Sequence, residues 1–215
     1  QGETDVSFQV QESTIMFASI DKWSTLLTSL SSTESFAFIN NLFSMYDQEM
    51  ANFEHLTKLR AIGNAYMVCG GLFDNGTVNS AHIVLNYALK ILSEAKQINS
   101  PAFDIKIGIH TGGPINCGIV GKNMPLFDVI GEPINIAFEL NKRGPPGFIQ
   151  ISEATYNNIK FMNYNIQENG EIFIKGESKK TFLVSIDPFP NENDTPSIFP
   201  TETGNIDVNQ TIPEE

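Results

Sequence analysis

The chain has 215 residues, of which 41% are hydrophobic and 16 are phenylalanine, enough to bury a sizeable core. A net charge of −12 without any cluster of lysine and arginine argues against a nucleic-acid-binding surface. Neither a signal peptide nor an apolar run of about 18 residues occurs, so this segment is expected to make no membrane contact.

The chain has two cysteines, Cys69 and Cys117, and neither has the spacing of a zinc site. We expect buried free thiols in a reducing compartment, with a disulfide as the alternative. The chain begins with Gln1 rather than Met, which suggests that it is part of a longer protein.

The first half of the chain predicts strands and two long helices. Residues 1–11 are interpreted as a lead-in, and the apolar run 14–20 as a strand buried on both faces. A helix should begin near 32–34, where serine and threonine precede Glu34. Its apolar stripe would comprise Phe36, Ile39, Phe43, Tyr46, Met50 and Phe53.

Gly63 and Asn64 separate two strand-like runs, 59–62 and 65–69, which predicts a tight hairpin. A second long helix should begin at Ser80 and end near Pro101. The alternation of isoleucine along 103–110 predicts another strand.

The second half predicts shorter elements. They are strands at 115–120 and 148–151, helices at 132–141 and 153–159, and an antiparallel pair at 171–175 and 181–186. His110 is expected to be a hydrogen-bonded structural residue, because no nucleophile or metal ligand lies at a recognisable spacing. Residues 187–215 carry seven acidic residues, no basic ones and five prolines, which indicates a disordered tail or linker.

This order of elements, and seven motifs along it, resembles the catalytic domain of class III nucleotidyl cyclases, the adenylyl and guanylyl cyclases. The resemblance covers residues 12–186 and implies an α+β sandwich with a ferredoxin-like βαββαβ core and a C-terminal β-rich extension. The motifs are MFASI (16–20), IGNAYM (62–67), IGIHTG (107–112), FDVIG (127–131), NIA (135–137), GFIQISEATY (147–156) and KG (175–176).

In that family two domains pair head to tail, and one half of each shared site supplies two aspartates that bind two divalent ions. The matching positions here are Ser19 and Asn64. Two neutral ligands cannot offset the dehydration of a hard dication. The resemblance therefore implies no metal bound by this chain alone, with Mg²⁺ or Mn²⁺ held only through a partner half. Asp21, two residues after Ser19, is an alternative ligand, although a solvated aspartate at a loop start is expected there.

The family's other half-site recognises the nucleotide. Here Arg60 and Asp128 match the purine-reading residues, and Lys175 matches a lysine that reaches the terminal phosphates. Asn135 matches the asparagine that orients the ribose. Glu139 replaces the arginine that stabilises charge on the α-phosphate, with the cations at 142 and 143 nearby. A guanylyl cyclase would be expected to carry glutamate at position 60, so the preference leans to adenine.

The chain is most similar to the second cytosolic half of membrane adenylyl cyclases, which also lacks the metal ligands. The expected function is the non-metal half of a heterodimeric adenylyl cyclase that converts ATP to cyclic AMP and pyrophosphate, inactive alone. The alternative is a non-catalytic dimerisation or ligand-binding regulatory module of a larger signalling protein. Expected partners are another cyclase domain, as a homodimer or heterodimer, and ATP or another purine nucleotide. The expected location is cytoplasmic, in the cytosolic part of a membrane protein.

Overall fold

The computed structural model describes residues 7–74, 76–98 and 101–190. The predicted tail therefore lies, from residue 191 onward, outside the described residues. The strands are β1 (Ser7–Val10), β2 (Ser13–Ile20), β3 (Leu56–Ile62), β4 (Ala65–Gly70), β5 (Ile105–Gly112), β6 (Ile115–Val120), β7 (Leu126–Ile130), β8 (Ile149–Ser152), β9 (Asn165–Ile174) and β10 (Glu177–Ser185). The helices are α1 (Trp23–Thr28), α2 (Ser32–Met50), α3 (Ser80–Ala95), α4 (Glu132–Arg143) and α5 (Glu153–Ile159).

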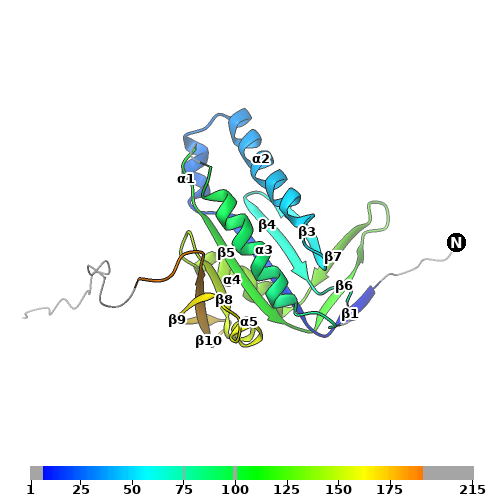
Figure 1. Ribbon diagram of the computed structural model, residues 1–215. Coiled ribbons are helices and arrows are strands. Elements are labelled where there is room, and N and C mark those ends of the chain that lie inside the picture. Colours follow the sequence, from blue (N-terminus) through cyan, green and yellow to red (C-terminus); the bar gives the residue numbers. More distant parts are fainter. Residues whose placement is uncertain (1–6, 75, 99–100, 191–215) are drawn as a thin grey trace, which may run out of the picture.

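The main sheet has seven strands in the order β3-β4-β2-β5-β8-β10-β9 (Figure 1). Strands β2 to β5, together with α2 and α3, form the predicted βαββαβ core, and β8, β10 and β9 form the β-rich extension. All neighbouring strands pair antiparallel except β5 and β8, which are parallel. The predicted fold class is confirmed.

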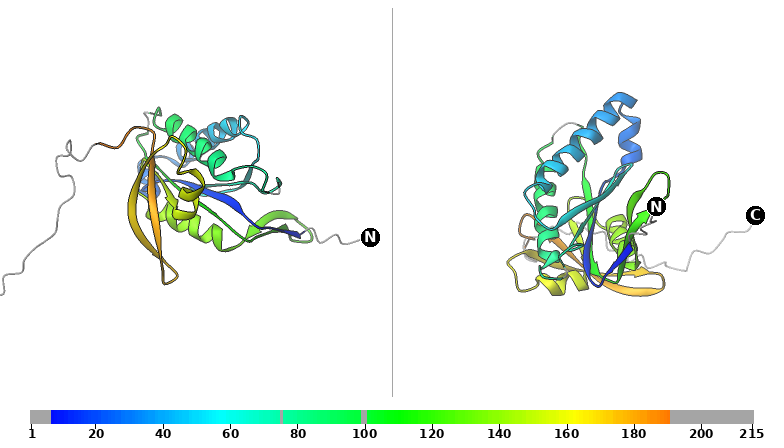
Figure 2. Two further views of the ribbon diagram at one scale, coloured as in Figure 1. Left: turned by 60° about the horizontal axis from the view of Figure 1, so that its bottom comes forward. Right: turned by 90° about the vertical axis from the view of Figure 1, so that its right-hand side faces the viewer.

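Strand β2 lies in the middle of the core because both of its faces are apolar. Successive side chains of a strand point to opposite faces. Met16 and Ala18 pack with α2 and α3 on one face of the sheet. Ile15 and Phe17 pack on the other face, with residues of α4, β6 and β7. Figures 1 and 2 show α2 and α3 together covering the first face.

Helix α4 packs closely on the second face of the sheet because Gly108 of β5 has no side chain. A Cβ atom on Gly108 would lie 2.1 Å from the backbone nitrogen of Asn141 and 2.6 Å from the carbonyl oxygen of Ala137. Glycine at this position therefore fixes how near α4 comes to the sheet.

Helix α2 has Ser31 as its N-cap, one residue before the predicted cap. The Ser31 side chain accepts a hydrogen bond from the backbone of Glu34, whose carboxylate accepts one from the Ser31 backbone in return. The predicted stripe is partly wrong, because Phe36 is 78% exposed and the fully packed positions include Phe38 and Leu42. The helix is rotated so that Phe36 lies at the edge of the buried face.

Three short elements were not predicted. Strand β1 lies in the segment interpreted as a lead-in and pairs with β6, and β7 completes that three-stranded sheet. Helix α1 is six residues long and buries none of them, so it gives no periodic signal. No helix among the described residues is long and apolar enough to cross a bilayer.

Candidate functional site

A groove of about 430 Å³ lies between the β3–β4 hairpin and helix α4. Its volume falls within the range of small-molecule sites, and most of its lining is apolar. The polar side chains that reach it come from β3 and from the hairpin tip. The lining residues are Phe17, Arg60, Ile62, Asn64, Ala65, Met67, Val129, Ile134 and Phe138.

Ser19, at the first of the two expected metal positions, is hydrogen-bonded to helix α4. Its hydroxyl donates to Oδ1 of Asn141 at 2.9 Å. The amide nitrogen of Asn141 donates to two backbone carbonyls, Phe17 O at 3.2 Å and Lys106 O at 2.6 Å. Both carbonyls can only accept, so the amide nitrogen must face them and Oδ1 must face Ser19. Position 19 therefore requires a donor rather than a carboxylate.

Asn64, at the second expected metal position, is also used internally. Its amide nitrogen donates to the carbonyl oxygen of Ile20 at 3.0 Å. In the reverse direction, the Ile20 N–H donates to the Asn64 carbonyl at 3.4 Å. The NH₂ group of Asn64 therefore points at the Ile20 carbonyl oxygen, and its partial positive charge would repel a cation placed there.

These residues do not fit a divalent ion. Ser19 and Asn64 are neutral, and each directs a hydrogen-bond donor where a metal ligand would have to present a lone pair to the ion. Within the part of the chain that the structure describes, no group of three His, Cys, Asp or Glu side chains is placed to hold a metal.

Asp21 does not replace the missing carboxylates. Its Oδ1 lies 3.8 Å from Nζ of Lys106, and its side chain is 20% exposed. The same Lys106 amine donates to the carbonyl of Lys142 at 2.8 Å. Asp21 is thus balanced by a neighbouring lysine rather than being the solvated loop-start residue that we expected.

Arg60 and Asp128, the two expected purine-reading residues, are brought together by the structure. They come from β3 and β7, 68 residues apart, and form an ion pair in which the Arg60 guanidinium donates to Asp128 Oδ1. The same oxygen accepts from the backbone N–H of Val129 at 2.7 Å. Arg60 lines the apolar groove, and the second carboxylate oxygen of Asp128 has no hydrogen-bond partner among the described residues.

The other expected site residues are placed less closely together. Asn135 is exposed on α4, and Lys175 is exposed at the tip of the β9–β10 hairpin, where its φ is 51°. Glu139, one turn after Asn135, accepts a hydrogen bond from Nε of Arg143 at 2.8 Å. Arg143 therefore neutralises Glu139, and neither Lys175 nor Glu139 lines the groove.

Asn141, the hydrogen-bond partner of Ser19, is the residue at the first expected metal position that sequence reasoning missed. Asn141 is 4% exposed. It lies at the end of a predicted helix, where an asparagine ordinarily faces solvent or caps the helix. It contacts Ser19, 122 residues away in sequence. No local pattern in the chain indicates such a pairing.

His110 is part of a buried hydrogen-bond network, as its structural interpretation predicted. Its Nδ1 lies 2.7 Å from the Ser152 hydroxyl, which is followed by the hydroxyls of Thr155, Thr111 and Thr14 at 2.9–3.1 Å. Burial, assisted by the charge of Lys179, lowers the pKa of His110 to about 4. The imidazole is therefore neutral at pH 7 and is not poised as a general base.

This lowered pKa predicts acid sensitivity. The unfolded chain takes up a proton on His110 near pH 6.5 but the folded chain only near pH 4, so stability is lost as the pH falls through this window. Urea unfolding should give a free energy about 2 kcal/mol lower at pH 4.5 than at pH 7 from this residue. The His110→Gln variant should lack that part of the decrease. An equal decrease in both proteins would show that His110 is not responsible.

Both cysteines are buried free thiols, as expected. Burial raises the pKa of Cys69 to about 12, so its thiol is not a nucleophile at neutral pH.

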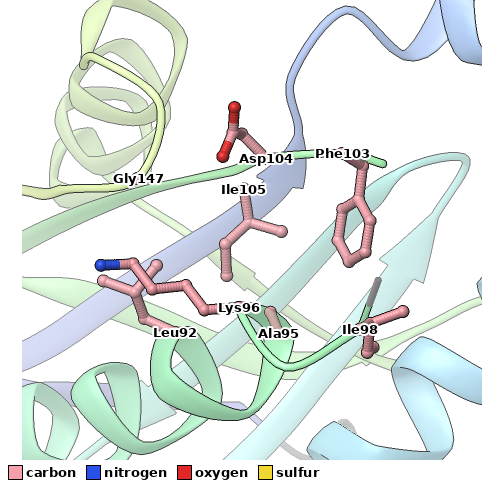
Figure 3. A pocket seen from close by; sticks show the side chains of 8 residues that line it. All are labelled: Leu92, Ala95, Lys96, Ile98, Phe103, Asp104, Ile105 and Gly147. Atoms are coloured by element: carbon pink, nitrogen blue, oxygen red, sulfur yellow. The ribbon is translucent and has the colours of Figure 1, made fainter. Parts of the chain in front are cut away.

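A smaller pocket of about 120 Å³ lies between the end of α3, residues 103–105 and Gly147 (Figure 3). Lys96 lines it, but the volume is well below what a nucleotide needs.

Comparisons with known proteins show the family and the fold of this chain. Residues 6–186 match the family described as the adenylate and guanylate cyclase catalytic domain. The human guanylate cyclase soluble subunit beta-2 is 28% identical over 190 residues, which cover 86% of this chain and 30% of that protein. The chain thus spans about a third of the length of this curated relative.

Solved structures give the same result. The catalytic core of a rhodopsin-guanylyl cyclase with converted specificity, in complex with ATPαS, superposes with a TM-score of 0.77 at 26% identity. The match covers 83% of this chain and 97% of that chain. A non-canonical dimeric guanylyl cyclase domain from the fungus Blastocladiella emersonii superposes with a TM-score of 0.74 at 25% identity, covering 82% and 97%.

Proposed function

Because the chain belongs to the adenylate and guanylate cyclase catalytic domain family, we propose that it is the non-metal half of a shared cyclase site. The observation that carries this proposal is that Ser19 and Asn64 both donate hydrogen bonds within the chain. Another cyclase domain, in a homodimer or heterodimer, would have to supply the two ions. The dimeric fungal neighbour supports pairing as a mode of assembly for this fold.

The chain's own contribution would be nucleotide binding. The Arg60–Asp128 pair offers a donor and an acceptor to the edge of a purine, and Ile62 and Phe138 of the groove lining offer exposed apolar surface. Arg60 in place of glutamate favours adenine, so the proposed substrate is ATP and the products are cyclic AMP and pyrophosphate.

Two further residues would act on the rest of the nucleotide. Asn135 is exposed on α4, with its amide available to orient the ribose, and Lys175 is exposed with its amine available to the terminal phosphates. Receptor-type relatives suggest a parent protein that is larger and membrane-anchored, with this domain on the cytosolic side.

A complementation assay tests the proposal. This chain should be mixed with a cyclase domain that retains both metal aspartates but carries inactivating substitutions in its own purine-binding residues. Neither protein alone should form cyclic nucleotide, whereas the mixture should do so in Mn²⁺. Substituting Arg60→Ala should reduce that turnover by about a hundredfold, because a charged contact to the nucleotide is lost.

Two controls give the assay its meaning. Lys160→Ala, on the exposed surface after α5, should leave the turnover of the mixture unchanged. A comparison of ATP with GTP reports the purine preference directly. A mixture that is silent with both nucleotides, although the two proteins associate, would contradict the shared-site function.

A second function is favoured by Glu139. The family's cation on the α-phosphate is replaced here by a carboxylate that is held by Arg143, and losing such a cation costs about 3 kcal/mol of transition-state stabilisation. The chain would then be a non-catalytic module that dimerises and binds a nucleotide or another ligand to regulate a larger signalling protein. Mixed instead with an intact metal-bearing cyclase, this module would lower the activity of that cyclase or leave it unchanged, and it would not restore the activity of the substituted partner.

A further inference from the structure

A second cavity lies on the other side of helix α4 from the groove. It has a volume of about 310 Å³ and is bounded by α4, the junction of β8 and α5, and strand β10. Ile134 and Phe138 of α4 line the groove, whereas Ile136 and Leu140 line this cavity. Residues two apart on a helix point to opposite sides, so one helix separates the two sites. None of the four residues assigned to nucleotide binding lines the cavity.

His110 lines this cavity, and one of its two ring nitrogens is not used in a hydrogen bond within the described residues. The residue is 9% exposed, and its Nδ1 is bonded to the Ser152 hydroxyl at 2.7 Å. Among the described residues, nothing is hydrogen-bonded to its Nε2. The ring is neutral at pH 7, so when Nδ1 accepts the serine proton the ring's own proton is on Nε2. Nε2 is not among the fully buried side-chain atoms that lack a partner, so it is accessible from the cavity that His110 lines and can donate to a ligand that brings an acceptor.

Charged side chains surround the opening. Lys179 and Lys180 of β10 line the cavity and are paired with Glu177 at 2.6 Å and Glu168 at 3.2 Å. Glu153 also lines it. The positive charge of Lys179 contributes to lowering the pKa of His110. The carboxylates of Glu153, Glu168 and Glu177 repel anions, so they limit how much negative charge a ligand in the cavity can carry. A single carboxylate is therefore better suited than a doubly charged phosphate.

We propose that this cavity is a binding site for a small monocarboxylate with an apolar body. The carboxylate accepts a hydrogen bond from Nε2–H of His110 and lies near the ammonium group of Lys179. The apolar body packs against Ile136 and Leu140 of α4. The proposal concerns binding and stands whether or not the chain shares a cyclase site. Because α4 also lines the groove, an occupant here contacts the helix that shapes the candidate nucleotide site.

Benzoate is the probe for this site, followed by NMR on the full 215-residue chain labelled with ¹⁵N. Benzoate should give a saturable shift of His110 Nε2 and of the amides of 134–140. Benzyl alcohol, which keeps the ring but has no charge, should bind about tenfold more weakly. The absence of a saturable shift with benzoate, or equal binding of the alcohol, would overturn the proposal.

Two variants locate the probe. His110→Phe removes Nε2 and should weaken benzoate by about tenfold. If that buried variant does not fold, Lys179→Gln still tests the site, because this side chain is 36% exposed and its loss should not affect folding. Lys179→Gln should weaken benzoate about fivefold, whereas Lys160→Gln, on the exposed surface after α5, should leave the affinity unchanged. Equal affinities in Lys179→Gln and Lys160→Gln would contradict the site.

Discussion

Restoring the family aspartate at position 19 is expected to destabilise this chain rather than to build a metal site. In Ser19→Asp a carboxylate faces Oδ1 of Asn141, which cannot turn away because its amide nitrogen is bonded to two carbonyls. The hydrogen bond is lost and two acceptors are left in contact. The free energy of unfolding, measured with urea, should fall by about 3 kcal/mol.

Ser19→Ala is the matched control, because it removes the hydroxyl without adding charge. It should cost about 1 kcal/mol. The Ser19→Asp, Asn64→Asp double variant should be less stable still, since the new carboxylate at 64 faces the Ile20 carbonyl. If Ser19→Asp proved as stable as Ser19→Ala, the interaction of Ser19 with Asn141 would not be what excludes a carboxylate.

Gly108→Ala should have an effect as large, through helix α4. The new Cβ would lie 2.1 Å from the backbone nitrogen of Asn141 and 2.6 Å from its Cα. Backbone atoms cannot rotate away as a side chain can, so the helix must move from the sheet. We expect a loss of about 3 kcal/mol in unfolding free energy and shifted amide resonances throughout 132–143.

Gly176→Ala separates this close approach from the general effect of replacing a glycine. Gly176 has a φ of +86°, but a Cβ there would meet no atom within 4 Å. Only the backbone strain remains, about 1 kcal/mol. Equal losses in Gly108→Ala and Gly176→Ala would argue that contact with α4 is not the cause.

The core of the fold could be predicted because its local signals and its packing agree. The run 14–20 is almost continuously apolar and forms a strand buried on both faces, and Gly63–Asn64 forms the turn that its composition predicts. Strand β1 could not be predicted, because its exposed residues become a strand only by pairing with β6. Phe36 was assigned to the core on spacing alone, which does not determine how far a helix is rotated.

For the candidate site, sequence identified which residue types are present but not which atoms they contact. The loss of two carboxylates at 19 and 64 is visible in the sequence, and so is the candidate pair of Arg60 and Asp128. The role of Asn141 is not visible, because it arises where the end of α4 meets β2 in three dimensions. Asp21 looked solvated in sequence because Lys106, 85 positions later, gives no local sign of lying beside it.

The central claim, that both metal positions are occupied by the chain's own hydrogen bonds, is tested most directly by a cyclase assay on the chain alone. ATP and GTP should each be incubated with the 215-residue protein in excess Mn²⁺, alongside the Asp128→Ala and Asn135→Ala variants. We predict no cyclic nucleotide above the level of those variants. Turnover by the unsubstituted chain that Asp128→Ala or Asn135→Ala abolishes would contradict the account.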